Sequence, residues 1–313
     1  MAATLLSHPM PKPHSIHEYA SLAKPPHLAR LEGATHKSGV VEPLSISVDD
    51  TDDGYVPGFL HLPPDFFTTN PPGASGQQDQ SQEPPPATAL PPHHHRTAAI
   101  LLSGAGGGVA GPSSVYLSLA CKLATLGRGI PTLRLDYRFP GKAGACAADA
   151  RAGMAYLRDM YGLDRFVLVG WSFGGAVVLS TAADDPRVVG CATVASQTAD
   201  GALDGAARLA PRPLLLLHGS GDNTLCVGCS QRLFHAYGAG DRTLEVFEGD
   251  NHSLSRNAEL AEEMLCEFVA RCAGVRVGAE EKRDVLMAEL VEDGERHNLM
   301  ERGGDLRPPE RED

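Results

Sequence analysis

Residues 166–180, FVLVGWSFGGAVVLS, decide the fold class of this chain. The run starts with four apolar residues, which are typical of a strand covered on both faces. Three glycines then flank Ser172 and predict a sharp turn. A second apolar run follows and predicts a helix. A buried strand that turns directly into a helix is typical of a parallel sheet packed between helices.

The same alternation continues along the chain after residue 96. Short apolar runs are followed by stretches of helical length and pattern. The expected strands are 97–102, 130–135, 165–169, 188–194, 213–217 and 243–247, and the expected helices are 113–126, 145–161, 173–183, 228–238 and 256–272. Upstream, alternating residues between 40 and 61, split by the turn-forming DDTDDG, predict a β-hairpin. We therefore expect an α/β fold with a mostly parallel sheet and helices on both faces.

We expect a single folded domain, residues 34–275, between two less ordered ends. Residues 1–33 are rich in Pro and His without a period, which predicts a weakly ordered N-terminal arm. Residues 63–96 are rich in Pro and Gln and predict a disordered insertion. Residues 279–313 contain 12 acidic and 6 basic residues. We therefore interpret 276–313 as an acidic, largely disordered tail that either aids solubility or binds a partner.

Charge and cysteine content narrow the classes of partner and compartment. The 313 residues include 39 acidic and 27 basic ones, a net charge of −12. This balance argues against nucleic acid and an anionic membrane as partners. The seven cysteines lie mostly in apolar runs, which favours a reducing compartment. No signal-peptide core or run of roughly 18 apolar residues occurs, so the sequence predicts a cytoplasmic protein.

Residues 170–174, Gly-Trp-Ser-Phe-Gly, match the G-x-S-x-G pattern of a nucleophilic serine at a strand-to-helix turn. A serine hydroxyl needs a base to take its proton and an acid to orient that base. In a parallel sheet both come from loops at later strand ends, in the order acid, then His. Asp222 in HGSGDNT and His252 in EGDNHSLS satisfy this order. The pattern predicts a catalytic triad of Ser172, Asp222 and His252.

Other acids compete with Asp222 for the orienting role. Asp200 and Asp204 follow the preceding expected strand, a position that can also face the base. Asp250 is two residues from His252, too close in sequence to align easily behind the imidazole. We favour Asp222 and keep Asp200 or Asp204 as the alternative.

The motifs GWSFGG, LLLLHGSGDNT and FEGDNHSL together resemble the α/β-hydrolase superfamily, and most of all its small dienelactone-hydrolase-like and serine esterase or peptidase members. The resemblance covers about residues 40–272 and assigns nucleophile, acid and base to the three triad candidates. It also implies an oxyanion hole formed by the backbone N–H of Phe173 and by that of Ala105 or Gly106 in the loop SGAGGGVAG.

The resemblance implies a serine hydrolase that forms an acyl-enzyme on a small acyl substrate: a carboxylic ester by preference, or a lactone, thioester or accessible amide. Residues 196–213 leave no room for a large cap domain, so we expect an open, shallow site. No cofactor or metal is expected. Activity should rise with pH as a histidine near its ordinary pKa of about 6.5 loses its proton.

Three other interpretations use some of the same residues. Gly106, Gly108 and Gly111, with Asp136 further on, fit a dinucleotide-binding fingerprint, although this leaves the triad candidates unexplained. The fold could also serve as a noncatalytic binding or scaffold module. His93–His95 and the pair Cys226 and Cys229 lack the further ligands of a metal site.

Overall fold

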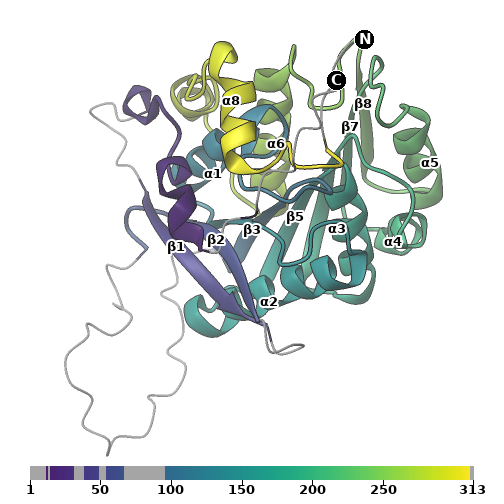
Figure 1. Cartoon of the computed structure of the whole chain (residues 1–313), viewed down its shortest axis with the longest axis horizontal. Coiled ribbons are helices and arrows are strands. Elements are labelled where there is room, and N and C mark those ends of the chain that lie inside the picture. Colours follow the sequence, from purple (N-terminus) through teal and green to yellow (C-terminus); the bar gives the residue numbers. More distant parts are fainter. Residues whose placement is uncertain (1–11, 13–14, 32–38, 49–53, 67–95, 311–313) are drawn as a thin grey trace, which may run out of the picture.

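The computed structural model describes residue 12 and residues 15–31, 39–48, 54–66 and 96–310. Within these residues eight strands form one sheet (Figure 1). The strands are β1 Val40–Ser47, β2 Tyr55–Leu62, β3 Thr97–Leu102, β4 Thr132–Leu135, β5 Arg165–Trp171, β6 Val188–Val194, β7 Leu214–Gly219 and β8 Arg242–Phe247. Their order across the sheet is β1-β2-β4-β3-β5-β6-β7-β8. The expected strands are all present, with ends that differ by up to two residues.

The first two strands form the antiparallel edge of the sheet. β1 pairs with β2 from Val40 opposite Leu62 to Ser47 opposite Tyr55, so the expected hairpin is confirmed. β2 is also antiparallel to β4, whereas all later pairs are parallel. The carboxyl ends of β3, β5, β7 and β8 therefore meet at one edge, where a doubly covered sheet binds its ligands.

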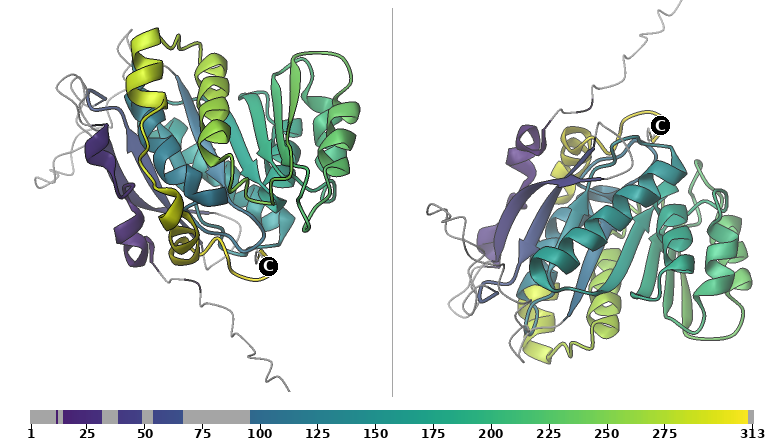
Figure 2. Two further views of the ribbon diagram at one scale, coloured as in Figure 1. Left: turned by 90° about the horizontal axis from the view of Figure 1, so that it is seen from above. Right: turned by 90° about the horizontal axis from the view of Figure 1, so that it is seen from below.

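Helices cover both faces of the sheet, as the views in Figure 2 show. α2 Ala143–Tyr161, α3 Phe173–Asp184, α4 Ala202–Leu209 and α5 Gly228–Tyr237 contribute to the core on one face; α1 Val115–Thr125 and α6 Ala258–Cys272 contribute to the core on the other. Within β5, Phe166 and Leu168 point into the first core, and Val167 and Val169 into the second. A strand with two buried faces needs apolar residues at every position, which explains the unbroken apolar runs.

Helix α4, in the segment between β6 and β7, was not expected from the sequence. Ala202, Ala206 and Leu209 are buried against the core, and the exposed side mixes the charged Asp204 and Arg208 with Leu203 and Ala207. With only eight residues, its apolar face is too short to give a clear helical period. The helix packs on α3 and leaves no room for a cap domain, so that expectation is confirmed.

The N-terminal arm is more ordered than expected. Residues 16–22 form a 3-10 helix, η1 Ile16–Leu22, and a second one follows, η2 Leu28–Arg30. Ile16, Tyr19 and Leu22 recur every three residues and are all buried, because a 3-10 helix brings such positions onto one face. The buried guanidinium of Arg134 donates to the carbonyl oxygens of Leu22 and Ala23, at 2.9 Å each, and fixes the end of the helix.

The expectation of a largely disordered C-terminal tail is wrong for the described residues up to 310. This part contains α7 Ala279–Glu281, the short π-helix η4 Lys282–Leu286 and α8 Asp293–Gly303. α8 packs against η3 Pro112–Ser114. Val285, Leu286, Leu290 and Met300 join the core on the α1 and α6 face. These apolar residues are few and irregularly spaced among acidic ones, so the sequence shows no clear helical period in this part of the chain.

Two expectations fall largely or wholly outside the described residues. The proposed insertion, 63–96, is described only at its two ends, where the ring of Phe66 packs 5.9 Å from that of Tyr161. His93–His95 also lie outside the described residues. Within the described part of the chain, no helix combines the length and the apolar character that crossing a bilayer requires.

Candidate active site

Ser172 occupies a strained turn between β5 and α3. Its backbone has φ of 54°, a left-handed value that is rare for a residue other than glycine. The turn also needs small neighbours: a Cβ on Gly170 would collide with the backbone of Gly174, and a Cβ on Gly174 would collide with that of Ser103. The sequence therefore holds the serine side chain at the end of β5 by close backbone contacts.

Asp222 and His252 come together from the loops after β7 and β8. Nδ1 of His252 lies 2.7 Å from Oδ2 of Asp222, and both side chains are buried. The other oxygen of Asp222 accepts hydrogen bonds from the backbone N–H groups of Thr224 and Leu225, at 2.8 Å each. The carboxylate is thus fixed, and Nδ1 carries the hydrogen that it donates to Asp222.

Two further side chains support this pair. His218, at the end of β7, places Nε2 3.2 Å from Oδ2 of Asp222 and 2.9 Å from the carbonyl oxygen of Leu225. On the other side, Nε1 of Trp171 donates to the carbonyl oxygen of His252 at 3.1 Å, and the two rings lie 5.5 Å apart. Trp171 was not among the site residues expected from the sequence, although it stands next to Ser172 in the chain.

The charges in this group lower the pKa of the acid, Asp222, and raise the pKa of the base, His252. Burial alone would raise the pKa of Asp222, but hydrogen bonds from His218 and His252 outweigh it and hold the pKa well below its usual range. Burial alone would lower the pKa of His252, but contacts with Asp222 and with Glu310 raise it to about 9. The imidazole is therefore held in its protonated form at neutral pH.

The competing acids lie elsewhere. Asp200 is exposed and accepts from Gln197, and exposed Asp204 pairs with Arg208. Asp250 is buried, but its carboxylate accepts from its neighbours Asn251, Arg256 and Asn257 at the start of α6. The contact to Nδ1 of His252 is made by Asp222, the acid that the sequence favoured.

The comparisons with known proteins agree with this architecture. A family model described as the alpha/beta hydrolase fold matches residues 87–214. Solved structures with similar folds include Est1E from Butyrivibrio proteoclasticus (16% identity, 74% of this chain and 99% of that chain, TM-score 0.54). A dienelactone hydrolase from Anabaena variabilis is 19% identical over 74% of this chain and 99% of that one, with a TM-score of 0.52. No curated protein sequence matches the chain significantly.

A serine hydrolase without a lid from Xanthomonas campestris is also similar (17% identity, 74% of this chain and 94% of that one, TM-score 0.51). The chain has the α/β-hydrolase fold. The resemblance inferred from the three motifs is thereby confirmed for the fold.

In this α/β-hydrolase fold the glycine-rich loop after β3 faces Ser172. The backbone N–H of Ala105 donates to Oε1 of Glu310 at 2.7 Å, and the hydroxyl of Ser172 donates to the same oxygen at 2.7 Å. The serine hydroxyl and a main-chain amide thus hold one oxygen between them, an arrangement similar to that of an oxyanion hole. Of the two candidates Ala105 and Gly106, Ala105 is the one whose N–H points there.

Glu310 is the residue of this site that the sequence analysis missed. Its second oxygen, Oε2, lies 3.3 Å from Nε2 of His252 as an ion pair. The C-terminal segment that carries it runs from α8 towards β7 (Figure 1, yellow). The expectation of an open, shallow site is wrong, because Ser172 and His252 are only 3% and 4% exposed with this segment in place.

The residues of the dinucleotide fingerprint have other partners. The carboxylate of Asp136 accepts from the N–H of Gly108 at 2.9 Å and from the hydroxyl of Tyr19 at 3.0 Å. Burial raises its pKa to about 6. The C-terminal segment packs against the glycine loop, so these glycines serve a contact within the chain.

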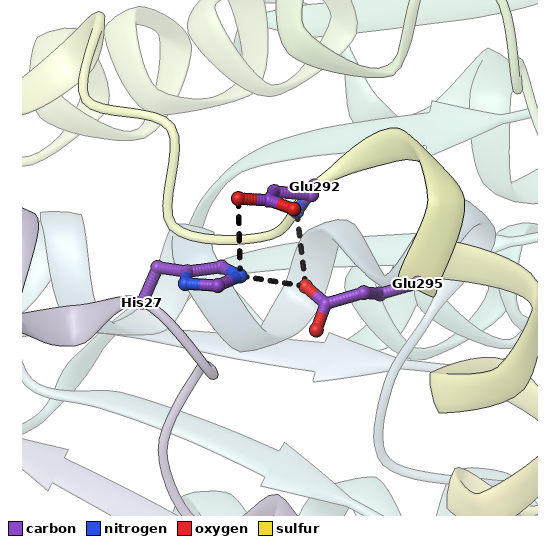
Figure 3. Close-up of side chains that lie close together, drawn as sticks. All are labelled: His27, Glu292 and Glu295. Carbon is purple, nitrogen blue, oxygen red and sulfur yellow. Dashed lines mark hydrogen bonds and ion pairs between the residues drawn. The ribbon is translucent and has the colours of Figure 1, made fainter.

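Figure 3 shows a second group of titratable side chains, far from Ser172 in sequence. Nε2 of His27 lies 2.8 Å from Oε2 of Glu295 and 3.6 Å from Oε1 of Glu292. Such donors can ligate a cation, but the guanidinium of Arg30 already pairs with Glu292 and with Glu289. The group joins the N-terminal 3-10 helices to the start of α8. Cys226 and Cys229 are free thiols, one exposed and one buried.

Proposed function

We propose that this chain is a serine hydrolase that cleaves a small ester, lactone, thioester or accessible amide through an acyl-enzyme on Ser172. One observation carries the proposal. The imidazole of His252 has Nδ1 against Asp222, at 2.7 Å, and Nε2 against a carboxylate that Ser172 itself binds. The same carboxylate brings the hydroxyl of Ser172 and Nε2 of His252 to one place, and acyl transfer requires these two groups to share a proton once the carboxylate has left.

The reaction would proceed in two steps, acylation and then deacylation of Ser172. In the first, Oγ of Ser172 forms a bond to the acyl carbon while its proton passes to Nε2 of His252. The bond from the acyl carbon to the leaving group then breaks, and the same proton passes to the leaving atom. In the second step, a water molecule gives its proton to His252 and attacks the acyl carbon. The carboxylic acid leaves, and Ser172 regains its proton.

Each supporting group has one part in this scheme. Asp222 keeps the hydrogen on Nδ1 and stabilises the imidazolium that forms during each step. The N–H groups of Ala105 and Phe173 would stabilise the oxyanion, since each such donor is worth about 3 kcal/mol of the barrier in comparable sites. No step needs a metal or an organic cofactor.

The bond type is tested with matched short-chain p-nitrophenyl esters, thioesters and aminoacyl amides. Est1E has also been solved with ferulic acid bound, so a ferulate ester belongs in the same panel. We expect a burst of p-nitrophenol and one acetyl group on the peptide that contains Ser172, detected by mass spectrometry. Turnover without an acyl adduct on Ser172 would contradict the mechanism.

The alternative is a noncatalytic binding module with the same fold. The observation that favours it is the filled site, because Glu310 contacts both Ser172 and His252. A folded chain that turns over no substrate, even after Glu310→Ala, would support this alternative.

A further inference from the structure

The glycine loop after β3 and the C-terminal segment fit together position by position. A Cβ on Gly104 would lie 2.6 Å from Cδ of Glu310, and one on Gly106 would lie 2.5 Å from the carbonyl oxygen of Arg307. A Cβ on Gly108 would lie 2.5 Å from Cγ of Asp305. Alternate glycines of the loop thus each face one residue of the segment, in antiparallel order.

Each of these three residues of the segment is also buried and bound. Asp305 accepts from the N–H groups of Ala110 and Gly111, at 2.9 and 2.8 Å, and from the hydroxyl of Ser103. Polar groups buried in this way are costly unless each finds a partner. Both carboxylate oxygens of Asp305 have partners in the loop, which indicates that the loop and the segment form a specific contact.

Arg307 supplies the second anchor. Its guanidinium donates to the carbonyl oxygen of Gly106 at 3.2 Å, to Asp136 at 3.4 Å, and to the hydroxyl of Tyr19. The segment is therefore tied both to the loop and to the N-terminal 3-10 helix. These anchors lie away from the reacting atoms and fix where the next three residues go.

Glu310 is the end of this contact and the part that meets the triad candidates. Its Oε1 accepts from Ser172 and Ala105, and its Oε2 faces Nε2 of His252. The carboxylate thus has the three partners that a carboxylic acid product would have after deacylation.

We propose that the acyl site of this chain is a carboxylate-binding site, and that residues 304–310 fill it as a built-in inhibitor with Glu310 as the ligand. The proposal rests on the hydrolase function proposed above. It goes further, because it names a ligand class for the site and a segment that must leave before substrate enters.

The contacts block the reaction in three ways. The hydroxyl of Ser172 and the N–H of Ala105 are both committed to Oε1. The ion pair with Oε2 favours the imidazolium form of His252, which cannot accept a proton. The carboxylate also places a negative charge where the oxyanion would develop. Substrate can therefore react only in the fraction of molecules whose segment has moved away.

The charged groups around His252 give this inhibition a pH dependence. Asp222 faces Nδ1 and itself contacts His218, while Glu310 faces Nε2. Burial opposes ionisation of Glu310, but its contact with His252 outweighs burial and lowers its pKa. Loss of the proton from His252 at alkaline pH therefore removes the partner of Glu310 and favours the open segment.

The test measures the rate at which a fluorophosphonate labels Ser172 in the full chain and its variants. Glu310→Ala removes the ligand, and Arg307→Ala removes an anchor that does not touch Ser172 or His252. Glu301→Ala is the control, because it removes the same charge from an exposed position in α8. We expect Glu310→Ala and Arg307→Ala to label at least about tenfold faster than the wild type, and Glu301→Ala to label at the wild-type rate.

Sodium acetate probes the ligand class directly. It should slow the labelling of Glu310→Ala, where the site is empty, and leave the wild-type rate unchanged, with sodium chloride of equal ionic strength as the reference. Melting curves of all variants check that each is folded.

The outcomes separate this inference from the function on which it rests. If Glu310→Ala and Arg307→Ala label at the wild-type rate, and Ser172→Ala does not label, the hydrolase stands and the inhibitor is disproved. If no folded variant labels, the proposed function fails, and the inhibitor fails with it. Faster labelling of both variants, with acetate slowing Glu310→Ala, would support both.

Discussion

Nδ1 of His252 lies 2.7 Å from Oδ2 of Asp222, although 30 residues separate them in the chain. The two loops that carry them follow β7 and β8, which are adjacent parallel strands. Because parallel neighbours end at the same edge, an acid after one strand and a histidine after the next meet there. This geometry makes the chemistry at Ser172 testable residue by residue.

Replacing the proposed nucleophile should abolish turnover without loss of the fold. Ser172→Ala removes the only atom that forms the acyl bond, so kcat/KM for p-nitrophenyl acetate should fall by about 10⁴-fold or more. Ser180→Ala, in the helix that follows Ser172, is the control, since its hydroxyl donates to the carbonyl oxygen of Val177 within the same helix. Equal losses in the two variants would mean that the effect is structural.

Asp222→Asn tests which acid orients the base. An amide in place of the carboxylate favours the wrong tautomer of His252 and leaves the imidazolium without its counter-charge, so kcat should fall by about 10⁴-fold. Asp204→Asn should have no effect, because Asp204 is exposed and paired with Arg208. A large loss of kcat in Asp204→Asn and none in Asp222→Asn would show that Asp204, and not Asp222, orients the base.

The pH dependence of kcat/KM follows from the raised pKa of His252. The sequence suggested a rise in activity near pH 6.5, whereas burial, Asp222 and Glu310 together set the pKa at about 9. Only neutral imidazole is a base, so wild-type activity should increase as pH rises through about 9. In Glu310→Ala one of the two carboxylates is gone, and the midpoint should move down. An unchanged midpoint would show that Glu310 does not act on His252.

The raised pKa of His252 also predicts how the stability of the folded chain changes with pH. His252 has a higher pKa in the folded chain than its ordinary value of about 6.5. Its contribution to stability is therefore fully present below about pH 6.5 and is lost as pH rises through about 9. Thermal unfolding measured across this range should show the decline in the wild type and a smaller decline in Glu310→Ala.

Gly170→Ala tests whether the turn at Ser172 depends on close backbone contacts. The added Cβ would collide with the backbone of Gly174, which cannot move without disturbing the start of α3. We expect a loss of about 1–3 kcal/mol in the free energy of unfolding, measured by denaturant titration. Gly144→Ala, in α2 with nothing near its Cβ, should be neutral or stabilising by up to about 1 kcal/mol.

The sheet and the triad candidates were predictable because their signals are local. Buried parallel strands such as β3 and β7 are continuous apolar runs, and the loop after each strand end contributes its polar residue in a fixed chain order. The choice between Ala105 and Gly106 was not predictable, because it depends on which way a peptide plane faces in a glycine-rich loop.

The two chain ends were harder to predict for different physical reasons. Ile16, Tyr19 and Leu22 repeat every three residues, which does not match the 3.6-residue period of an α-helix. Asp305, Arg307 and Glu310 are buried charges with hydrogen-bond partners that lie 138 to 288 residues away in the sequence. A segment with many charged residues is expected to be exposed to solvent unless its partners are known, so the contact of Glu310 with the site was not predicted.

In the proposed mechanism His252 activates Ser172 as the nucleophile. The most direct measurement is mass spectrometry of the full chain, wild type and Glu310→Ala, after reaction with a fluorophosphonate. We expect one phosphonyl adduct on the peptide that contains Ser172, and none in Ser172→Ala or after prior acid denaturation. A folded Glu310→Ala chain that stays unmodified, or that carries the adduct on another residue, would contradict it.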